Sequence, residues 1–265
     1  MNLYWYNGKT INSQFIELEL DNPGLLYGAT VFTTLRIYNN SLDHPLTHWL
    51  SHLDRIKTSL NFFNWQQPNW YLVRQGAEAI KQHFPVLRIT VFPDGKEWIT
   101  GRNLPQDLAQ KQKHGITASL ANSQFYRSLP SHKTGNYLTA WQAKIHAQDI
   151  NTQEAIFTDP QGNWLETTTG NLWGWKDDSW WTPPLDGGIL PGIVLGHLTT
   201  FLRNQQYNVY QEPWTKELVE SFDAIAYSNC VVETVPIHTV IQPASQLEYN
   251  SYHICLKQLE NFFLI

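Results

Sequence analysis

The chain has 265 residues, a formal net charge of −5 at pH 7 and 14% aromatic residues. This length allows a substantial buried core in one large domain or two smaller ones. No run of lysine or arginine is long enough to indicate binding to nucleic acid or to an anionic membrane, so a small-molecule substrate is expected. The two cysteines, Cys230 and Cys255, form neither a metal-ligand pair nor a disulfide framework, which fits a reducing compartment.

The sequence carries no signal for export or membrane insertion. Residues 1–9 lack the basic and apolar segments of a signal peptide, and no later stretch stays apolar for the length of a membrane span. We therefore expect a cytoplasmic protein that binds neither membrane nor metal.

The N-terminal half predicts an α+β arrangement. Asn7-Gly8 is a strong signal for a two-residue turn, and apolar positions after Thr47 recur at helical spacing. The expected elements are a hairpin of strand 3–6 with a strand running toward Ile16, a strand over 25–38, helices over 47–60 and 71–84, and a strand over 86–92.

A polar stretch over residues 103–113, with Pro105 and no apolar periodicity, predicts a linker. We therefore expect a small N-terminal α+β domain over residues 1–113, including the linker, and a C-terminal cofactor-binding domain over 114–265. The C-terminal part predicts strands at 115–120, 155–158, 172–175, 224–227 and 231–235, and helices at 136–149, 192–204 and 216–221.

Lys133 directly precedes a predicted helix, and the end of an element can hold an amine in a fixed approach inside a cleft. A surface lysine in a loop is the alternative. His132 and Tyr137 beside it favour a pocket, which Tyr137 would reach from one helical turn further on. The Lys133 amine could then form a Schiff base with an aldehyde.

Glu166 ends a predicted strand and is followed by three threonines, Gly170 and Asn171. Taken alone it could be an exposed glutamate in a polar hairpin. A carboxylate at this place could instead hold a pyridine nitrogen protonated, so that the ring accepts electrons.

Residues 188–194 place glycines and Pro191 directly ahead of an apolar helix, whose N-terminal amides could receive a phosphate. Helix capping explains the glycines equally well. Arg55 is the expected guanidinium partner of that phosphate, with an ion pair to Asp54 as the alternative. An amine, a carboxylate and a phosphate cup along one chain predict a site for pyridoxal 5'-phosphate.

These residues resemble the class IV aminotransferase family, the fold type IV enzymes that use pyridoxal phosphate. The resemblance spans nearly the whole chain, through motifs at 27–36, 52–55, 133–137, 166–171 and 190–193. It implies a two-domain fold, with a small N-terminal α/β sandwich and a larger C-terminal domain with a β-barrel-like core, and a homodimer. The implied cofactor residues are Arg55, Lys133, Tyr137, Glu166, Asn171, Gly192, Ile193 and Val194.

The chain departs from the family at two places. Gly28-Ala29-Thr30 stands where the family usually has Gly-Asp-Gly, and Val194-Leu195 stands where a hydroxylic residue and an arginine are common. Val194 can therefore offer the phosphate only its backbone amide. We expect the missing polar group to come from Ser228 or Asn229.

Within the family, Phe32-Thr33-Thr34-Leu35-Arg36 is most similar to the lyases that act on 4-amino-4-deoxychorismate. That resemblance implies elimination of pyruvate to leave 4-aminobenzoate for folate synthesis, with Lys133 as base and Thr34 as proton donor to the departing oxygen. The substrate has two carboxylates, and the expected partners are Arg36, Arg88 and Arg102. The alternatives are a branched-chain or D-amino acid aminotransferase and an inert relative that only binds. Intact Lys133 and Glu166 argue against the last.

Overall fold

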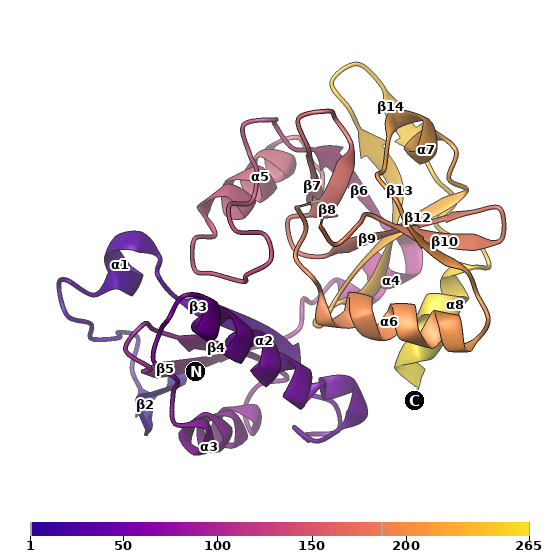
Figure 1. Ribbon diagram of the computed structural model, residues 1–265. Coiled ribbons are helices and arrows are strands. Elements are labelled where there is room, and N and C mark those ends of the chain that lie inside the picture. The colour runs from indigo at the N-terminus through magenta and orange to yellow at the C-terminus, as the bar shows by residue number, and fades with distance from the viewer. Residues whose placement is uncertain (1, 187, 265) are drawn as a thin grey trace. The chain divides into compact units, whose positions relative to one another are not determined.

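A computed structural model describes residues 2–186 and 188–264 of the chain, and it divides into two compact units (Figure 1). The first unit comprises Met1–Pro105 and His132–Tyr137, and the second comprises Gln106–Ser131 and Leu138–Ile265. The division thus falls earlier than the expected boundary after Lys113. The linker expected over 103–113 is wrong in its second half, because Leu108–His114 forms helix α4, which packs on strand β13 (Glu233–Ile241). Leu108 is its one buried residue, so the sequence shows no apolar period there.

The first unit is an antiparallel sheet in the order β2-β1-β5-β4-β3. Asn7 and Gly8 have positive φ values of 44° and 79°, which confirms the predicted turn between β1 and β2. Helices α2 and α3 confirm the two predicted helices. The elements are β1 (Leu3–Tyr6), β2 (Lys9–Asn12), β3 (Val31–Arg36), α2 (Trp49–Phe62), α3 (Trp70–Lys81), β4 (Val86–Val91) and β5 (Glu97–Arg102).

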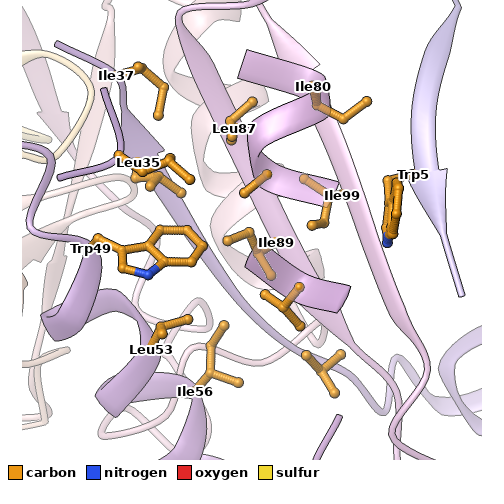
Figure 2. Close-up of a cluster of buried hydrophobic side chains, with 14 of the residues drawn as sticks. Trp5, Leu35, Ile37, Trp49, Leu53, Ile56, Ile80, Leu87, Ile89 and Ile99 are labelled. Atoms are coloured by element: carbon orange, nitrogen blue, oxygen red, sulfur yellow. The ribbon is translucent and has the colours of Figure 1, made fainter. Parts of the chain in front are cut away.

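One face of this sheet forms the core of the first unit with α2 and α3 (Figure 2). Alternate strand residues point to it, among them Leu35, Leu87, Ile89 and Ile99, all fully buried. The residues between them, including Phe32, Thr34 and Arg88, therefore lie on the opposite face. That opposite face carries Thr34 and Arg88, two of the residues expected to act on substrate.

The strand expected over 25–38 is wrong in its first part. Asn22 caps a short helix, α1 (Pro23–Tyr27), by accepting from the amide of Gly24, and Gly28 ends that helix with φ 64°. A proline at its start and a glycine after its end are ordinary helix signals that the apolar run Leu25-Leu26-Tyr27 obscured.

Residues 132–137, from the middle of the chain, pair with β3 at the edge of this sheet. The Phe32 amide donates to the carbonyl of Lys133 at 2.8 Å, and the Gly135 amide donates to the carbonyl of Thr30 at 2.8 Å. Val31 and Thr134 form an antiparallel bridge between these contacts. Lys133 is therefore held in a segment that pairs with β3, and the following helix, α5, begins only at Leu138 (Leu138–Asp149).

The second unit confirms the predicted barrel-like core (Figure 1). Six strands follow one another in the order β9-β12-β13-β6-β7-β8, and β8 pairs back with β9 to close the ring. Apart from β13, the ring strands are β6 (Ile116–Leu120), β7 (Glu154–Thr158), β8 (Trp164–Thr167), β9 (Asn171–Lys176) and β12 (Ala224–Asn229).

Three further strands extend the sheet, and three further helices complete the second unit. The strands are β10 (Ser179–Thr182), β11 (Val209–Gln211) and β14 (Gln246–Glu248), and the helices are α6 (Ile193–Asn204), α7 (Lys216–Glu220) and α8 (Leu256–Asn261). Across the described residues, no helix is both long and apolar enough to cross a membrane.

Two helical glycines give a matched test of the packing. A Cβ at Gly76 in α3 would lie 2.5 Å from the ring of Trp5, whereas a Cβ at Gly196 in α6 meets nothing within 4 Å. Gly76→Ala should therefore lower the free energy of unfolding by about 1–3 kcal/mol despite the better helix propensity of alanine. Gly196→Ala should leave it unchanged or raise it by up to about 1 kcal/mol. Urea unfolding of both variants measures this, and equal effects would contradict the packing of Trp5 on α3.

Candidate active site

The residues expected to act on substrate lie on the face of the first unit's sheet that points away from its core. Thr34 lies directly opposite Arg88, and Arg36, Val86 and Arg102 form a second row across β3, β4 and β5. Residues directly opposite in neighbouring strands share a face. The register therefore places Thr34 and all three expected arginines on the same face, which the sequence could not show because β5 was not predicted.

Lys133 lies beside two aromatic rings on this face. Its Nζ is 4.8 Å from the centroid of Phe32 and 5.3 Å from that of Tyr137, and the two rings meet edge to face at 5.7 Å. Lys133 and Tyr137 are thus close, as expected, but the expected helical turn between them is wrong. Pairing of residues 132–137 with β3 produces the contact instead.

Arg88 contacts the same Phe32 ring, with its Cζ at 3.6 Å from the centroid. Burial lowers the pKa of Arg88, and the nearby charge of Arg102 lowers it further, while Tyr137 raises it. Within residues 2–186 and 188–264, neither Arg88 nor Arg102 forms an ion pair with a carboxylate. Since guanidinium stays charged in proteins, the face offers positive charge to an anionic ligand.

The hydroxyl of Thr33, on the core face of β3, links Arg55 to His52. Arg55 Nη2 donates to Thr33 Oγ1 at 2.5 Å, and His52 Nδ1 lies 2.5 Å from the same oxygen. Asp54, the alternative partner for Arg55, has its carboxylate 3.7 Å from Lys57 Nζ. His52 and Thr33 are fully buried, so this cluster is part of the packed interior beside α2.

His132, next to Lys133, is buried against α2. Its Nδ1 lies 3.0 Å from the hydroxyl of Ser59, and its ring is 4.2 Å from that of Phe62. Burial lowers the pKa of His132, so the imidazole stays neutral at neutral pH. The residue therefore anchors the segment that carries Lys133 without adding a charge beside the amine.

In the second unit, Glu166 is a buried carboxylate with several donors. Arg127 Nε donates to its Oε1 at 2.7 Å, while the Leu190 amide at 3.2 Å and Asn171 Nδ2 at 3.4 Å reach its Oε2. Only 2% of the Glu166 side chain is exposed, which excludes the exposed hairpin glutamate considered above. Arg127 was missed from the sequence because it stands in a polar loop with no periodic or motif signal.

The turn after Glu166 is held by a second buried carboxylate, Glu154 on β7. Glu154 accepts from Lys144 Nζ at 2.6 Å, from the Thr169 hydroxyl at 2.8 Å and from the Thr168 hydroxyl. Thr167 and Gly170 close the turn on each other through hydroxyl, amide and carbonyl groups. The three threonines that seemed compatible with any turn thus each have a defined structural partner.

Helix α6 begins at Ile193, after Gly192, and no side chain caps its first turn. Asn171 Nδ2 donates to the carbonyl of Leu190 at 2.8 Å, which ties the entry of α6 to the Glu166 turn. A Cβ at Gly192 would collide with Asn171 Oδ1, so only glycine fits this approach. The amides of Ile193 and Val194 therefore open a twelve-residue helix, as the sequence predicted.

Ser228 and Asn229 both lie at the end of β12 and already have partners. Ser228 Oγ accepts from the indole of Trp173 at 2.9 Å. Asn229 Nδ2 donates to the carbonyl of Thr169 at 3.2 Å, and its Oδ1 accepts from the amides of Val231 and Val232. Asn229 thus serves the turn that carries Glu166, and a role for either residue toward phosphate stays a prediction.

Residues 30–240 match the amino-transferase class IV family, so the chain belongs to that family of pyridoxal phosphate-dependent enzymes. Aminodeoxychorismate lyase from Vibrio harveyi is 20% identical over 264 residues, which cover 93% of this chain and 94% of that protein.

Two solved structures show the same fold. The branched-chain amino acid aminotransferase of Escherichia coli superposes with a TM-score of 0.83 at 22% identity, over 99% of this chain and 93% of that one. A hypothetical aminotransferase from Mycobacterium tuberculosis, in its PLP-bound form, gives a TM-score of 0.82 at 16% identity, over 98% of each chain. At these identities the likenesses establish fold and leave the choice between lyase and aminotransferase open.

The residues present fit pyridoxal phosphate by their chemistry. Lys133 offers an amine beside aromatic rings, Glu166 offers a buried carboxylate, and α6 offers a helix N-terminus without a side-chain cap. These groups match an aldehyde, a pyridine nitrogen and a phosphate.

The contribution of the Glu154 hydrogen bonds to the free energy of unfolding can be measured directly. Glu154→Gln removes a buried charge that three donors share, so the free energy of unfolding should fall by about 1–3 kcal/mol. Glu212→Gln, at an exposed position, makes the same chemical change and should have little effect. Urea unfolding compares the two variants. Equal stability of Glu154→Gln and wild type would show that the turn does not depend on this carboxylate.

Proposed function

We propose that this enzyme is a 4-amino-4-deoxychorismate lyase, which releases pyruvate and leaves 4-aminobenzoate for folate synthesis. The observation that carries the proposal is the sheet face on which Thr34 lies opposite Arg88, with Arg36 and Arg102 in the neighbouring row. A substrate with two carboxylates requires several cations on one surface, together with a proton donor for the departing oxygen. The lyase relative from Vibrio harveyi supports the same choice.

In this proposal Lys133 carries pyridoxal phosphate covalently and Glu166 holds the proton at its pyridine nitrogen. Arg55 and the amides of Ile193 and Val194 receive the phosphate, and Tyr137 and Asn171 line the cofactor. When bound, the cofactor supplies an electron sink conjugated to the amine-bearing carbon of the substrate.

The chain's own groups then move two protons. With the cofactor bound, the Lys133 amine would remove the proton from the amine-bearing carbon of the substrate. As the C–O bond to the enolpyruvyl group breaks, the Thr34 hydroxyl gives a proton to the departing oxygen and regains one from the Lys133 ammonium. The released enol becomes pyruvate, and aromatisation of the ring drives the step. Arg88, with Arg36 and Arg102, holds the carboxylates so that the departing oxygen faces Thr34.

An aminotransferase acting on a branched-chain or D-amino acid is the second candidate, because the same cofactor residues serve both reactions. The fold shared with the Escherichia coli branched-chain aminotransferase keeps this candidate open. The two reactions differ in what they need besides the cofactor: a transaminase requires a keto-acid acceptor, whereas the lyase requires none.

The decisive experiment incubates the holoenzyme with aminodeoxychorismate and no keto acid. We expect stoichiometric pyruvate and 4-aminobenzoate, detected by a coupled dehydrogenase and by fluorescence. Thr34→Val keeps the strand's shape and should slow this release by roughly 100-fold to 10,000-fold, the range for a lost general acid. Cofactor absorbance of the variant should match wild type. Release within a few-fold of wild type would remove Thr34 from the proposal, and no release by wild type would favour the aminotransferase.

We also propose that the enzyme acts as a homodimer and that residues 15–27 contribute to the contact. Five large apolar side chains in this segment are solvent-exposed: Phe15, Leu20, Leu25, Leu26 and Tyr27. Helix α1 buries none of its own residues. Several exposed large apolar side chains in one short segment are typical of a protein contact.

Sedimentation velocity tests the assembly. Wild type should have a mass about twice the 30.7 kDa of one chain. Leu26→Asp should shift it toward the monomer, whereas Leu264→Asp, at a residue that is 79% exposed in the second unit, should not. A monomeric wild type with full activity would exclude the dimer, and a dimeric Leu26→Asp would exclude this segment from the contact.

A further inference from the structure

The hydroxyl of Thr33 has no role in the function proposed above, yet it contacts both the guanidinium of Arg55 and the imidazole of His52 in the interior of the first unit. Thr33 is fully buried on the core face of β3, next to apolar Val31 and Leu35 on the same face. A hydroxyl at such a position destabilises the fold unless hydrogen bonds satisfy it. Arg55 Nη2 and His52 Nδ1 satisfy it, each at 2.5 Å.

The direction of the hydrogen bond between Arg55 and Thr33 follows from the chemistry of the two groups. Guanidinium has only donors, so Thr33 Oγ1 accepts from Arg55. The Thr33 hydroxyl keeps its own hydrogen and a second lone pair, so it donates to His52 Nδ1 or accepts from it according to the tautomer of the imidazole. A continuous chain of hydrogen bonds thus runs from Arg55 through Thr33 to His52.

This arrangement limits how Arg55 can move. A guanidinium is planar and its N–H groups point in fixed directions, so a hydrogen bond from Nη2 to Thr33 restricts the directions in which the other donors can point. Arg55 is on α2 and Thr33 is on β3, and α2 packs against β3. The hydrogen bond therefore ties the arginine to the same strand that carries Thr34.

We propose that Thr33, supported by His52, is a positioning residue that holds Arg55 in the orientation needed to bind the cofactor's phosphate. The proposal rests on the cofactor assignment made above and adds a prediction of its own. Loss of the Thr33 hydroxyl should weaken binding of the phosphate group and leave binding of the ring unchanged. A general packing defect would weaken both.

The test compares pyridoxal 5'-phosphate with pyridoxal, which lacks the phosphate, on the apoenzyme of four proteins. Thr33→Val keeps the shape and removes the hydroxyl, while Thr33→Ser keeps the hydroxyl. Thr182→Val is the matched control, because Thr182 is also fully buried and its hydroxyl has no hydrogen-bond partner within the described part of the chain. Binding is followed by cofactor absorbance and by quenching of tryptophan fluorescence.

We expect Thr33→Val to bind pyridoxal 5'-phosphate about tenfold more weakly than wild type, the loss that one charge-assisted hydrogen bond corresponds to. Its affinity for pyridoxal should stay within about twofold of wild type, because only the phosphate meets Arg55. Thr33→Ser and Thr182→Val should resemble wild type with both compounds.

The outcomes separate this inference from the proposed function. A wild type that binds both compounds equally, or neither, would overturn the cofactor assignment itself. A wild type that prefers the phosphorylated compound, with the same preference in Thr33→Val, would overturn the role of Thr33 alone. Parallel loss of both affinities in Thr33→Val would show a packing role and also overturn it. Thr33→Ala provides the same comparison if the valine variant does not fold, as judged by thermal melting.

Discussion

Closure of the six-stranded ring in the second unit is the constraint on which the rest of that unit depends. Strands β8 and β9 meet at a single residue pair, Glu166 and Asn171, and without this pair the ring would be an open sheet with β8 as an unpaired edge. So short a pairing gives little backbone stabilisation. Side chains supply the rest, through Thr167, Glu154 and Asn229 around the turn. The carboxylate assigned to the cofactor thus sits at the seam of the barrel, where its position is fixed by the fold itself.

The sequence predicted most elements whose signals are local. Helical spacing identified α2 and α3, Asn7-Gly8 identified the first hairpin, and Pro191-Gly192 identified the start of α6. It failed where long-range contacts decide. The run Trp98-Ile99-Thr100 favours a strand but is cut short by Gly101, and only pairing with β1 and β4 defines β5 at the centre of the sheet.

The site shows the same division. Single residues such as Lys133 and Glu166 could be singled out from residue type and order, and their roles stay predictions. Their partners were not: Arg127 reaches Glu166 from 39 positions away, and Glu154 holds threonines 14 and 15 positions further on. The sequence predicts no separate role for Thr33, because strand alternation alone does not show that an arginine and a histidine converge on its hydroxyl.

The pairing of residues 132–137 with β3 makes the first unit discontinuous in sequence, and this affects how the chain can fold. During synthesis, residues 1–105 emerge with β3 as an unpaired edge, and the segment that covers it follows only after another stretch of the second unit has been made. The first unit thus finishes late, through contacts of large sequence separation, which are slow to form. Its nascent state presents Val31 to Arg36 as an open strand that a second nascent chain could pair with. Chaperone dependence and early aggregation are therefore expected to be governed by β3, the strand that bears Thr33 and Thr34.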